Sequence, residues 1–158
     1  MGLIVIALAA IGCTATQPAN PATLTVTQTP TELFNSNPTS AEDYYNRGNT
    51  YFHNGDYDHA IADFDKAIQL KRDNATAYNN RGIAYAKKGD YNRAIADFDM
   101  AIQLQPDLAK SYGNRGLAYK LKGENDKAIA DFRKVLELSN DPSLRQSAEN
   151  ELNEFGVQ

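Results

Sequence analysis

The chain has 158 residues, with 16 basic and 20 acidic side chains, a formal net charge of −4 and 42% hydrophobic residues. This length allows one ordinary domain, and the acidic balance disfavours a nucleic-acid binder, which normally carries a basic stripe. The single cysteine excludes a disulfide framework and a cysteine-rich zinc site.

The first twelve residues form an apolar run, MGLIVIALAAIG, which directly precedes Cys13. A short apolar segment that ends in small residues is typical of a secretory signal peptide. The sequence Ala10-Ile11-Gly12-Cys13 resembles the lipobox of bacterial lipoproteins. This resemblance implies that residues 1–12 are removed and that Cys13 carries a lipid. An ordinary signal peptide followed by an incidental cysteine is the alternative.

Residues 13–40 are rich in Thr, Pro, Asn and Gln, and Glu32 is the one charged side chain in residues 1–40. Such a segment contains too few apolar residues to offset the entropy lost on ordering. We therefore expect a disordered tether, which would hold a folded part away from a membrane.

From residue 41 onward, the sequence repeats with a period of 34 residues. The tripeptide Asn-Arg-Gly recurs at 46–48, 80–82 and 114–116, and Ala-Ile-Ala-Asp-Phe recurs at 60–64, 94–98 and 128–132. Within each copy, apolar and small residues recur at helical spacing on either side of a glycine-containing turn, which is Asn54-Gly55-Asp56 in the first copy. The pattern predicts two helices per copy, with Gly55 ending the first helix and Asp56 capping the second.

The period and its signposts resemble the tetratricopeptide repeat (TPR). The resemblance covers residues 41–74, 75–108 and 109–142 and implies an all-α fold, an α-α superhelix (a TPR solenoid) of three helix-turn-helix repeats. Pro106 and Pro142 are expected to separate helices, and Arg72 stands where the first copy would have its proline, so we expect a less sharp boundary there. Residues 143–158 contain apolar residues on one helical stripe and predict a C-terminal capping helix.

Several recurring side chains have structural interpretations. The tyrosines at the first-helix positions are expected to be packing residues. Arg47, Arg81 and Arg115 are expected to pair with nearby aspartates. The acidic pairs Asp63/Asp65 and Asp97/Asp99 are interpreted as a solvated outer face.

No catalytic constellation stands out in the sequence. His53 and His59 lie beside a turn, where we interpret them as solvated side chains, because the neighbouring aspartates lack calcium-loop spacing. A Walker loop, a G-x-G-x-x-G motif and a G-x-S-x-G motif are all absent from the sequence. The sequence therefore predicts neither an enzyme nor a metal or cofactor site.

The family resemblance implies that the first helices of the pairs line a concave groove for a peptide or a protein segment. Carried onto this chain, the groove residues are Tyr45, Asn49, Phe52, Asn80, Ile83, Lys87, Lys110, Asn114 and Leu117. Further lining positions include Glu42, Asn46, His53, Thr76, Asn79, Lys120 and Leu121.

Chaperone co-factors of this family grip a C-terminal carboxylate with Lys, Asn, Asn, Lys and Arg. Asn49, Asn80 and Lys110 match three of these places, whereas Tyr45 and Asn114 stand where the first Lys and the Arg would be. Bidentate carboxylate pairing is lost with the Arg, so we do not expect a full clamp.

Two function classes follow. The first is a non-catalytic protein-interaction module, a membrane-tethered adaptor or scaffold that is lipid-anchored in a bacterial cell envelope, facing the periplasm or at the outer membrane. The second is a structural TPR protein that forms homo-oligomers and has no peptide ligand.

Overall fold

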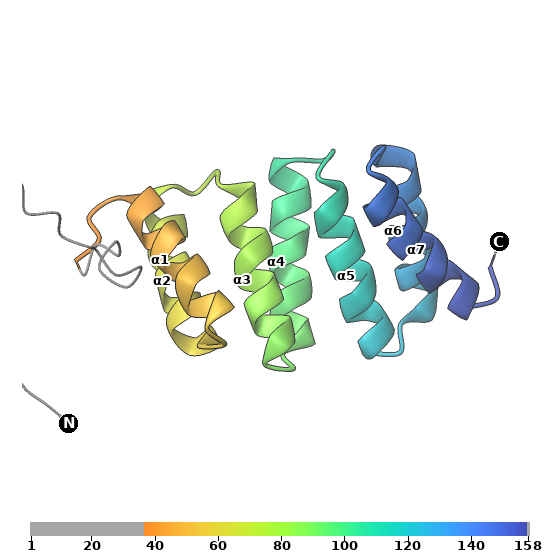
Figure 1. The fold of residues 1–158 in the computed structure, drawn as a ribbon, viewed down its shortest axis with the longest axis horizontal. Helices are drawn as coiled ribbons and strands as arrows, with labels where there is room; N and C mark the ends of the chain where they lie inside the picture. The colour runs from red at the N-terminus through yellow and green to blue at the C-terminus, as the bar shows by residue number, and fades with distance from the viewer. Residues whose placement is uncertain (1–36, 158) are drawn as a thin grey trace, which may run out of the picture. The chain divides into compact units, whose positions relative to one another are not determined.

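The computed structural model of the chain describes residues 37–157, which contain seven α-helices and no strand (Figure 1). The predicted all-α fold is therefore confirmed for this part of the chain. The tether and the lipidation residue Cys13 lie outside the described residues. The helices are α1 (Ala41–His53), α2 (Tyr57–Leu70), α3 (Ala75–Lys87), α4 (Tyr91–Leu104), α5 (Ala109–Leu121), α6 (Asn125–Leu138) and α7 (Pro142–Glu154).

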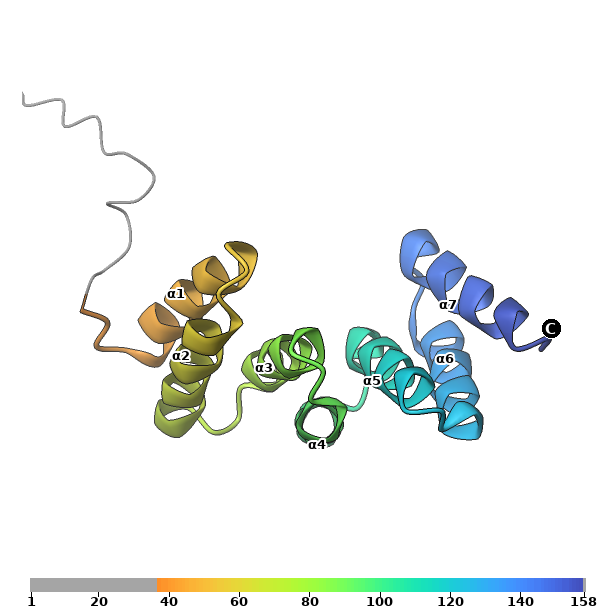
Figure 2. The same ribbon diagram turned by 90° about the horizontal axis from the view of Figure 1, so that it is seen from below.

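The helices pack mainly on their neighbours in sequence. The pairs α1–α2, α3–α4 and α5–α6 are joined by contacts of α2 with α3 and of α4 with α5, and α7 packs on α6. Figure 2 shows α1, α3, α5 and α7 along one side of this row and α2, α4 and α6 along the other. We call the first side the inner face. This arrangement confirms the three predicted helical hairpins and the capping helix.

In each pair of helices, a buried phenylalanine of the second helix packs against a glycine of the first. Phe64, Phe98 and Phe132 are at most 2% exposed, and each ring lies against a glycine on the first helix of its pair. A Cβ atom added to Gly82 would lie 2.7 Å from Cε1 of Phe98 and 3.1 Å from the carbonyl oxygen of Ala94. The first helix of a pair can therefore lie close to the second only where it lacks a side chain.

The turns inside the pairs follow the sequence expectation. Gly55, Gly89 and Gly123 have φ values of 78–80°, a conformation that side-chain-bearing residues rarely adopt. Asp56 and Asp90 then accept hydrogen bonds from backbone N–H groups in the first turns of α2 and α4. Glu124, at the equivalent place before α6, makes no such side-chain cap.

The recurring arginines form ion pairs within and between the pairs of helices. Arg81 on α3 binds both carboxylate oxygens of Asp97 on α4, with donor–acceptor distances of 2.6 and 2.8 Å, and also contacts Asp65 on α2 at 2.5 Å. Arg115 repeats this arrangement one copy later with Asp131 and Asp99. The predicted arginine–aspartate pairing is therefore confirmed.

The interpretation of the acidic pairs as a solvated outer face is wrong for one member of each pair. Asp63 and Asp97 are 4% and 5% exposed, because each points toward the arginine of its own helical pair. Two positions along the helix, Asp65 and Asp99 keep more contact with solvent, with side chains 40% and 51% exposed. The 34-residue period shows that both aspartates recur, but it does not indicate which of the two faces the neighbouring helix.

The boundaries between the copies are equally sharp with and without proline. Residues 71–74 connect α2 to α3, and residues 105–108 connect α4 to α5. The expectation of a less sharp boundary at Arg72 is therefore wrong. Asn74 caps α3 through its side chain at 3.1 Å, which ends the linker without help from a proline.

The capping helix α7 begins at Pro142, one residue earlier than the sequence indicated, and ends at Glu154. Ala148 and Leu152 are buried against Phe132 and Val135 of α6. Lys120 of α5 contacts Glu151 and Glu154 of α7, each at 2.6 Å. The last apolar face of the row is therefore covered. Among the described residues, none of the seven helices is long and apolar enough to span a bilayer.

Candidate peptide-binding groove

Three adjoining cavities open along the inner face. One, of about 210 Å³, lies between α1 and α3, and another, of about 240 Å³, is lined mainly by α3 and α5. The largest, of about 440 Å³, is lined by residues of α3, α5, α6 and α7. Ile83 lines all three, so the cavities adjoin one another at this residue. We call the three together the inner groove.

The structure brings most of the predicted groove residues together. Eight of them line at least one of the three cavities, and Tyr45 does not. The hydroxyl of Tyr45 instead accepts a hydrogen bond from Asn80 at 3.1 Å. The eight cavity-lining residues are Asn49, Phe52, Asn80, Ile83, Lys87, Lys110, Asn114 and Leu117. Their role in binding stays a prediction.

The groove amides form a hydrogen-bond network that connects three helices. Asn80 on α3 donates to Asn49 of α1 at 2.9 Å, as well as to Tyr45. Its neighbour Asn79 accepts from Asn114 of α5 at 3.0 Å and from the buried hydroxyl of Ser111 at 3.1 Å. The asparagines therefore set the spacing of the first helices, and both N–H donors of the Asn80 side chain are already used within the protein.

The charges along the groove are unevenly distributed. Among the described residues that line the three cavities there is no aspartate or glutamate. Lys87 and Lys110 are exposed, and neither makes an ion pair with another described residue. Lys120, one of the wider set of predicted lining residues, is instead bound by the two glutamates of α7. The groove therefore presents cations without compensating carboxylates.

The largest cavity has a floor and a wall that the sequence interpretation missed. Phe132 and Val135 of α6 contribute apolar surface, and Leu144, Ser147 and Ala148 of α7 close the far side. The sequence identified α7 only as a cap. Its apolar stripe was the available signal, because a helix that covers the last pair also borders the adjoining part of the inner face.

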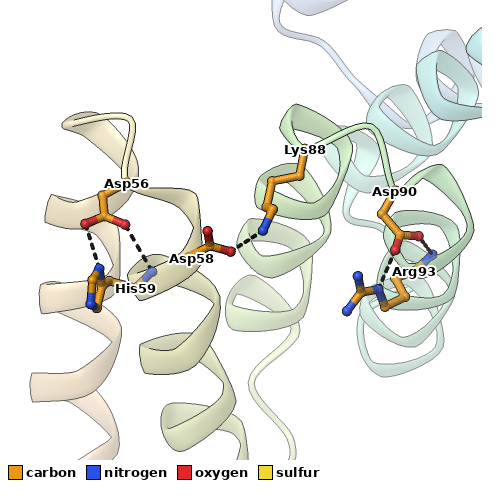
Figure 3. A network of polar contacts seen from close by, with 6 residues as sticks. All are labelled: Asp56, Asp58, His59, Lys88, Asp90 and Arg93. Atoms are coloured by element: carbon orange, nitrogen blue, oxygen red, sulfur yellow. Dashed lines mark hydrogen bonds and ion pairs between the residues drawn. The ribbon is translucent and has the colours of Figure 1, made fainter.

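A further depression lies at the turns between paired helices, and Figure 3 shows polar contacts in this region. It is lined by Lys88, Arg93 and Lys122 together with Asp90. Each cation is paired: Lys88 with Asp58, Arg93 with Asp90, and Lys122 with Glu124. The pairing leaves this depression without the net charge that would attract an ionic ligand.

The two histidines have different hydrogen-bond partners. His53 Nδ1 is 2.6 Å from the carbonyl oxygen of Asn49, and His59 Nδ1 is 2.7 Å from a carboxylate oxygen of Asp56. Within residues 37–157, no three His, Cys, Asp or Glu side chains come together as a metal site would require. The inner groove, by contrast, is suited to binding an extended chain, because amides, cations and apolar side chains lie side by side in its lining.

Comparisons with known families agree with this geometry. The family described as "Tetratricopeptide repeat" matches residues 75–108 and 109–141, and a second family of the same description matches residues 32–62. A family described as "TPR repeat" matches residues 48–89. The matches to residues 75–108 and 109–141 coincide with the helix pairs α3–α4 and α5–α6.

Solved structures that resemble this chain include peptide complexes. The second TPR of Spaghetti (RPAP3), bound to the HSP90 peptide SRMEEVD, is 34% identical, with a TM-score of 0.62 over 64% of this chain and 94% of that chain. The second TPR domain of human RPAP3, in complex with the HSP70 peptide SGPTIEEVD, is 31% identical, with a TM-score of 0.68 over 75% and 96% of the two chains.

A third structure, MamA, is 36% identical, with a TM-score of 0.61 over 63% of this chain and 58% of that chain. Among curated proteins, no significant match was found.

Proposed function

Because this chain belongs to the tetratricopeptide-repeat family, we propose that it is a non-catalytic adaptor that binds a peptide or a protein segment in its inner groove. The observation that carries the proposal is the series of three adjoining cavities over α1, α3, α5 and α7, lined by exposed cations, amides and apolar side chains without a carboxylate. Similar domains have been solved with bound peptides, which supports this use of the fold.

The groove offers a partner several kinds of contact. Ile83 and the 40% exposed Leu117 supply apolar surface in its centre. Lys110 and Lys87 supply charge, and the remaining N–H groups of Asn49 and Asn114 can pair with the backbone of an extended segment. All of these contacts are non-covalent, so they suit an adaptor that binds its partner without a chemical reaction.

Affinity capture on the immobilised helical part, residues 37–158, tests the proposal. The variant Leu117→Ser with Lys110→Gln changes two exposed groove residues, whereas Leu70→Ser changes a leucine that is 57% exposed on α2 and lies outside the three cavities. We expect the groove variant to lose captured partners and Leu70→Ser to retain them. Equal capture by both variants and the unaltered protein would refute the groove.

We further propose that the adaptor is anchored to a bacterial membrane through a lipid on Cys13, facing the periplasm or at the outer membrane. The support is the lipobox-like sequence around Cys13 and the Thr/Pro-rich composition of residues 14–40. Mass spectrometry of the mature N-terminus tests this directly. A diacylglyceryl mass on Cys13, lost in Cys13→Ser, is the expected result, and an unmodified cysteine in a full-length chain would contradict it.

A further inference from the structure

Two isolated lysines lie toward opposite edges of the inner groove. Lys110 is the second residue of α5, whereas Lys87 is the last residue of α3. The helices α3 and α5 contact each other, and both run from the top to the bottom of the view in Figure 1. Eleven positions of helical register separate the two lysines, which corresponds to roughly 16 Å along the helix axes. A single carboxylate therefore cannot contact both ammonium groups.

Apolar surface fills the space between the two lysines. Ile83 and Leu117 lie near the middle of α3 and α5, and both line the largest cavity. Below them, Phe132, Val135 and Leu144 extend the apolar lining. A cavity of about 440 Å³ is large enough to take a leucine- or phenylalanine-sized side chain, whose burial away from water is favourable.

The arginines near the groove are not available to a ligand carboxylate. Arg81 and Arg115 have side chains only 18% and 19% exposed, and each is bound by two aspartates. Burial by itself lowers the pKa of Arg81, but the hydrogen bonds of Asp97 and Asp65 outweigh this and raise it. Asn114, on the same face as Lys110, is neutral and donates to Asn79. A paired guanidinium grip on a chain terminus is therefore missing.

We propose that the occupant of the inner groove is an internal, extended segment of a partner protein, with an apolar side chain flanked on both sides by acidic residues. This inference rests on the proposed function and specifies the partner. The apolar side chain enters the cavity beside Leu117, and the two acids meet Lys110 and Lys87. At about 3.3 Å per extended residue, this axial separation of roughly 16 Å, to which the lateral offset between α3 and α5 adds, corresponds to acids at least about five positions apart. A free carboxyl terminus is not needed.

Two phage-displayed libraries of random twelve-residue peptides, panned on the helical part, test the inference. One library displays internal segments, and the other displays free carboxyl termini. We expect the internal library to yield segments with an apolar residue between two acids, and we expect synthetic versions to bind equally well with amidated and free carboxyl ends. Lys87→Gln and Lys110→Gln should each weaken binding by about two- to fivefold.

Charge reversal assigns each acid to its lysine. In Lys87→Glu and in Lys110→Glu, the selected segments should replace the acid at one end only with Lys or Arg, and the end should differ between the two variants. Lys71→Glu, at an exposed lysine outside the cavities, is the matched control and should leave the selected pattern unchanged. A shift at both ends in either variant, or in the control, overturns the assignment.

The outcomes separate this inference from the proposed function. Binders that come from the free-terminus library and lose tenfold or more in affinity on amidation would overturn the inference while leaving a groove adaptor in place. Binders insensitive to Leu117→Ser and to both lysine changes would overturn the groove itself. Enrichment in neither library would overturn the proposed function and this inference together.

Discussion

Gly82 lies where the aromatic ring of Phe98 presses against α3. Alanine is favoured over glycine inside a helix by about 1 kcal/mol, but its methyl group here would lie 2.7–2.9 Å from ring atoms of a side chain that is 1% exposed. A ring enclosed in this way has little room to move, so overpacking outweighs the helical preference.

We therefore expect Gly82→Ala to lower the free energy of unfolding by about 1–3 kcal/mol in urea denaturation. Gly113→Ala is the matched control, because its added Cβ would meet only Cγ2 of Val135, at 3.5 Å. This control should be neutral or stabilising by up to about 1 kcal/mol. Similar effects of both changes would show that the close approach of Phe98 is not the constraint.

Asp97 and Asp99 lie on the same helix and each binds an arginine, but they differ in burial, with side chains 7% and 51% exposed. Replacing Asp97 removes the two-point contact of a buried ion pair and leaves Arg81 with only the more exposed Asp65. Breaking a buried pair costs at most about 3–5 kcal/mol, whereas an exposed pair contributes about 1 kcal/mol or less. We expect Asp97→Asn to lower the free energy of unfolding severalfold more than Asp99→Asn, as measured by urea denaturation. Equal losses would contradict the distinction between the two faces.

For individual residues, the sequence shows which side chains recur, but it predicts only some of their contacts. The recurrence of Gly48, Gly82 and Gly116 opposite phenylalanines follows from sterics and was predictable. The pairing of Arg81 was predictable as a type of contact. The choice between Asp63 and Asp65 was not, because it depends on the rotation of α2 about its axis, which the spacing alone does not determine.

At the scale of elements, the caps of α2 and α4 link stability to pH. The ring and backbone N–H of His59 lower the pKa of Asp56 below the ordinary range of an aspartate, and the backbone N–H and guanidinium of Arg93 lower that of Asp90. Hydrogen bonds from Lys122 and Lys127 lower the pKa of Glu124 to about 2. Because these folded-state values lie below the unfolded values, their contribution is present above pH 4–5 and is lost as the pH falls toward 2.

The double variant Asp56→Asn with Asp90→Asn separates charge from capping. Asparagine is as good an N-cap as aspartate but does not titrate. We expect the Tm of this variant, followed by circular dichroism, to fall less between pH 4 and pH 2 than that of the unaltered protein. The alanine counterpart should also lose stability at pH 7, where the caps are missing. An unchanged acid slope in the asparagine variant would contradict the role of these carboxylates.

Helix α7 covers the apolar face of the last pair, and a mutation in α7 can test this role. Leu152 is 6% exposed in the core formed with Phe132 and Val135, so Leu152→Ala should cost about 2–5 kcal/mol. Because each pair contacts chiefly its neighbours, hydrogen exchange should accelerate most in α5–α7 and least in α1 and α2. The exposed Asn153→Ala is the control. Uniform acceleration over all helices would show that the row unfolds as a single unit.

The elements themselves were largely predictable. Seven helices, their turns and the cap follow from periodicity, glycine positions and the C-terminal apolar stripe. The contribution of α7 to the largest cavity was only partly predictable, because the apolar stripe shows that α7 covers the last pair but not how far the helix lies from α5. The equal sharpness of the Arg72 and Pro106 boundaries shows that an Asn cap serves as well as a proline.

At the scale of the whole helical unit, the two ends are made unlike the interior. The fully buried Ala77 and Ala84 of α3 correspond, 34 residues earlier, to Asp43 and Thr50 of α1. Both polar side chains are bonded locally, Asp43 to Ser40 and Thr50 to the carbonyl of Asn46. A preceding pair would have to bury these groups, so the N-terminal face does not favour stacking.

The polar N-terminal face argues against end-to-end association of the helical unit. Such association is what the alternative function, a homo-oligomer without a peptide ligand, would require. We expect sedimentation to give the mass of a monomer across a wide concentration range. The double change Asp43→Ala with Thr50→Ala makes the end resemble an interior face and should promote association. A concentration-dependent dimer of the unaltered helical unit would instead favour the structural alternative.

The central claim is that the inner groove is the binding surface. The most direct measurement is a titration of the ¹⁵N-labelled helical unit with an amidated peptide selected from the internal library, followed by backbone and side-chain amide NMR signals. The account predicts that the largest shifts fall on α1, α3, α5 and α7, including the side-chain amides of Asn49, Asn80 and Asn114. Shifts concentrated on α2, α4 and α6, with the groove signals unmoved, would contradict it.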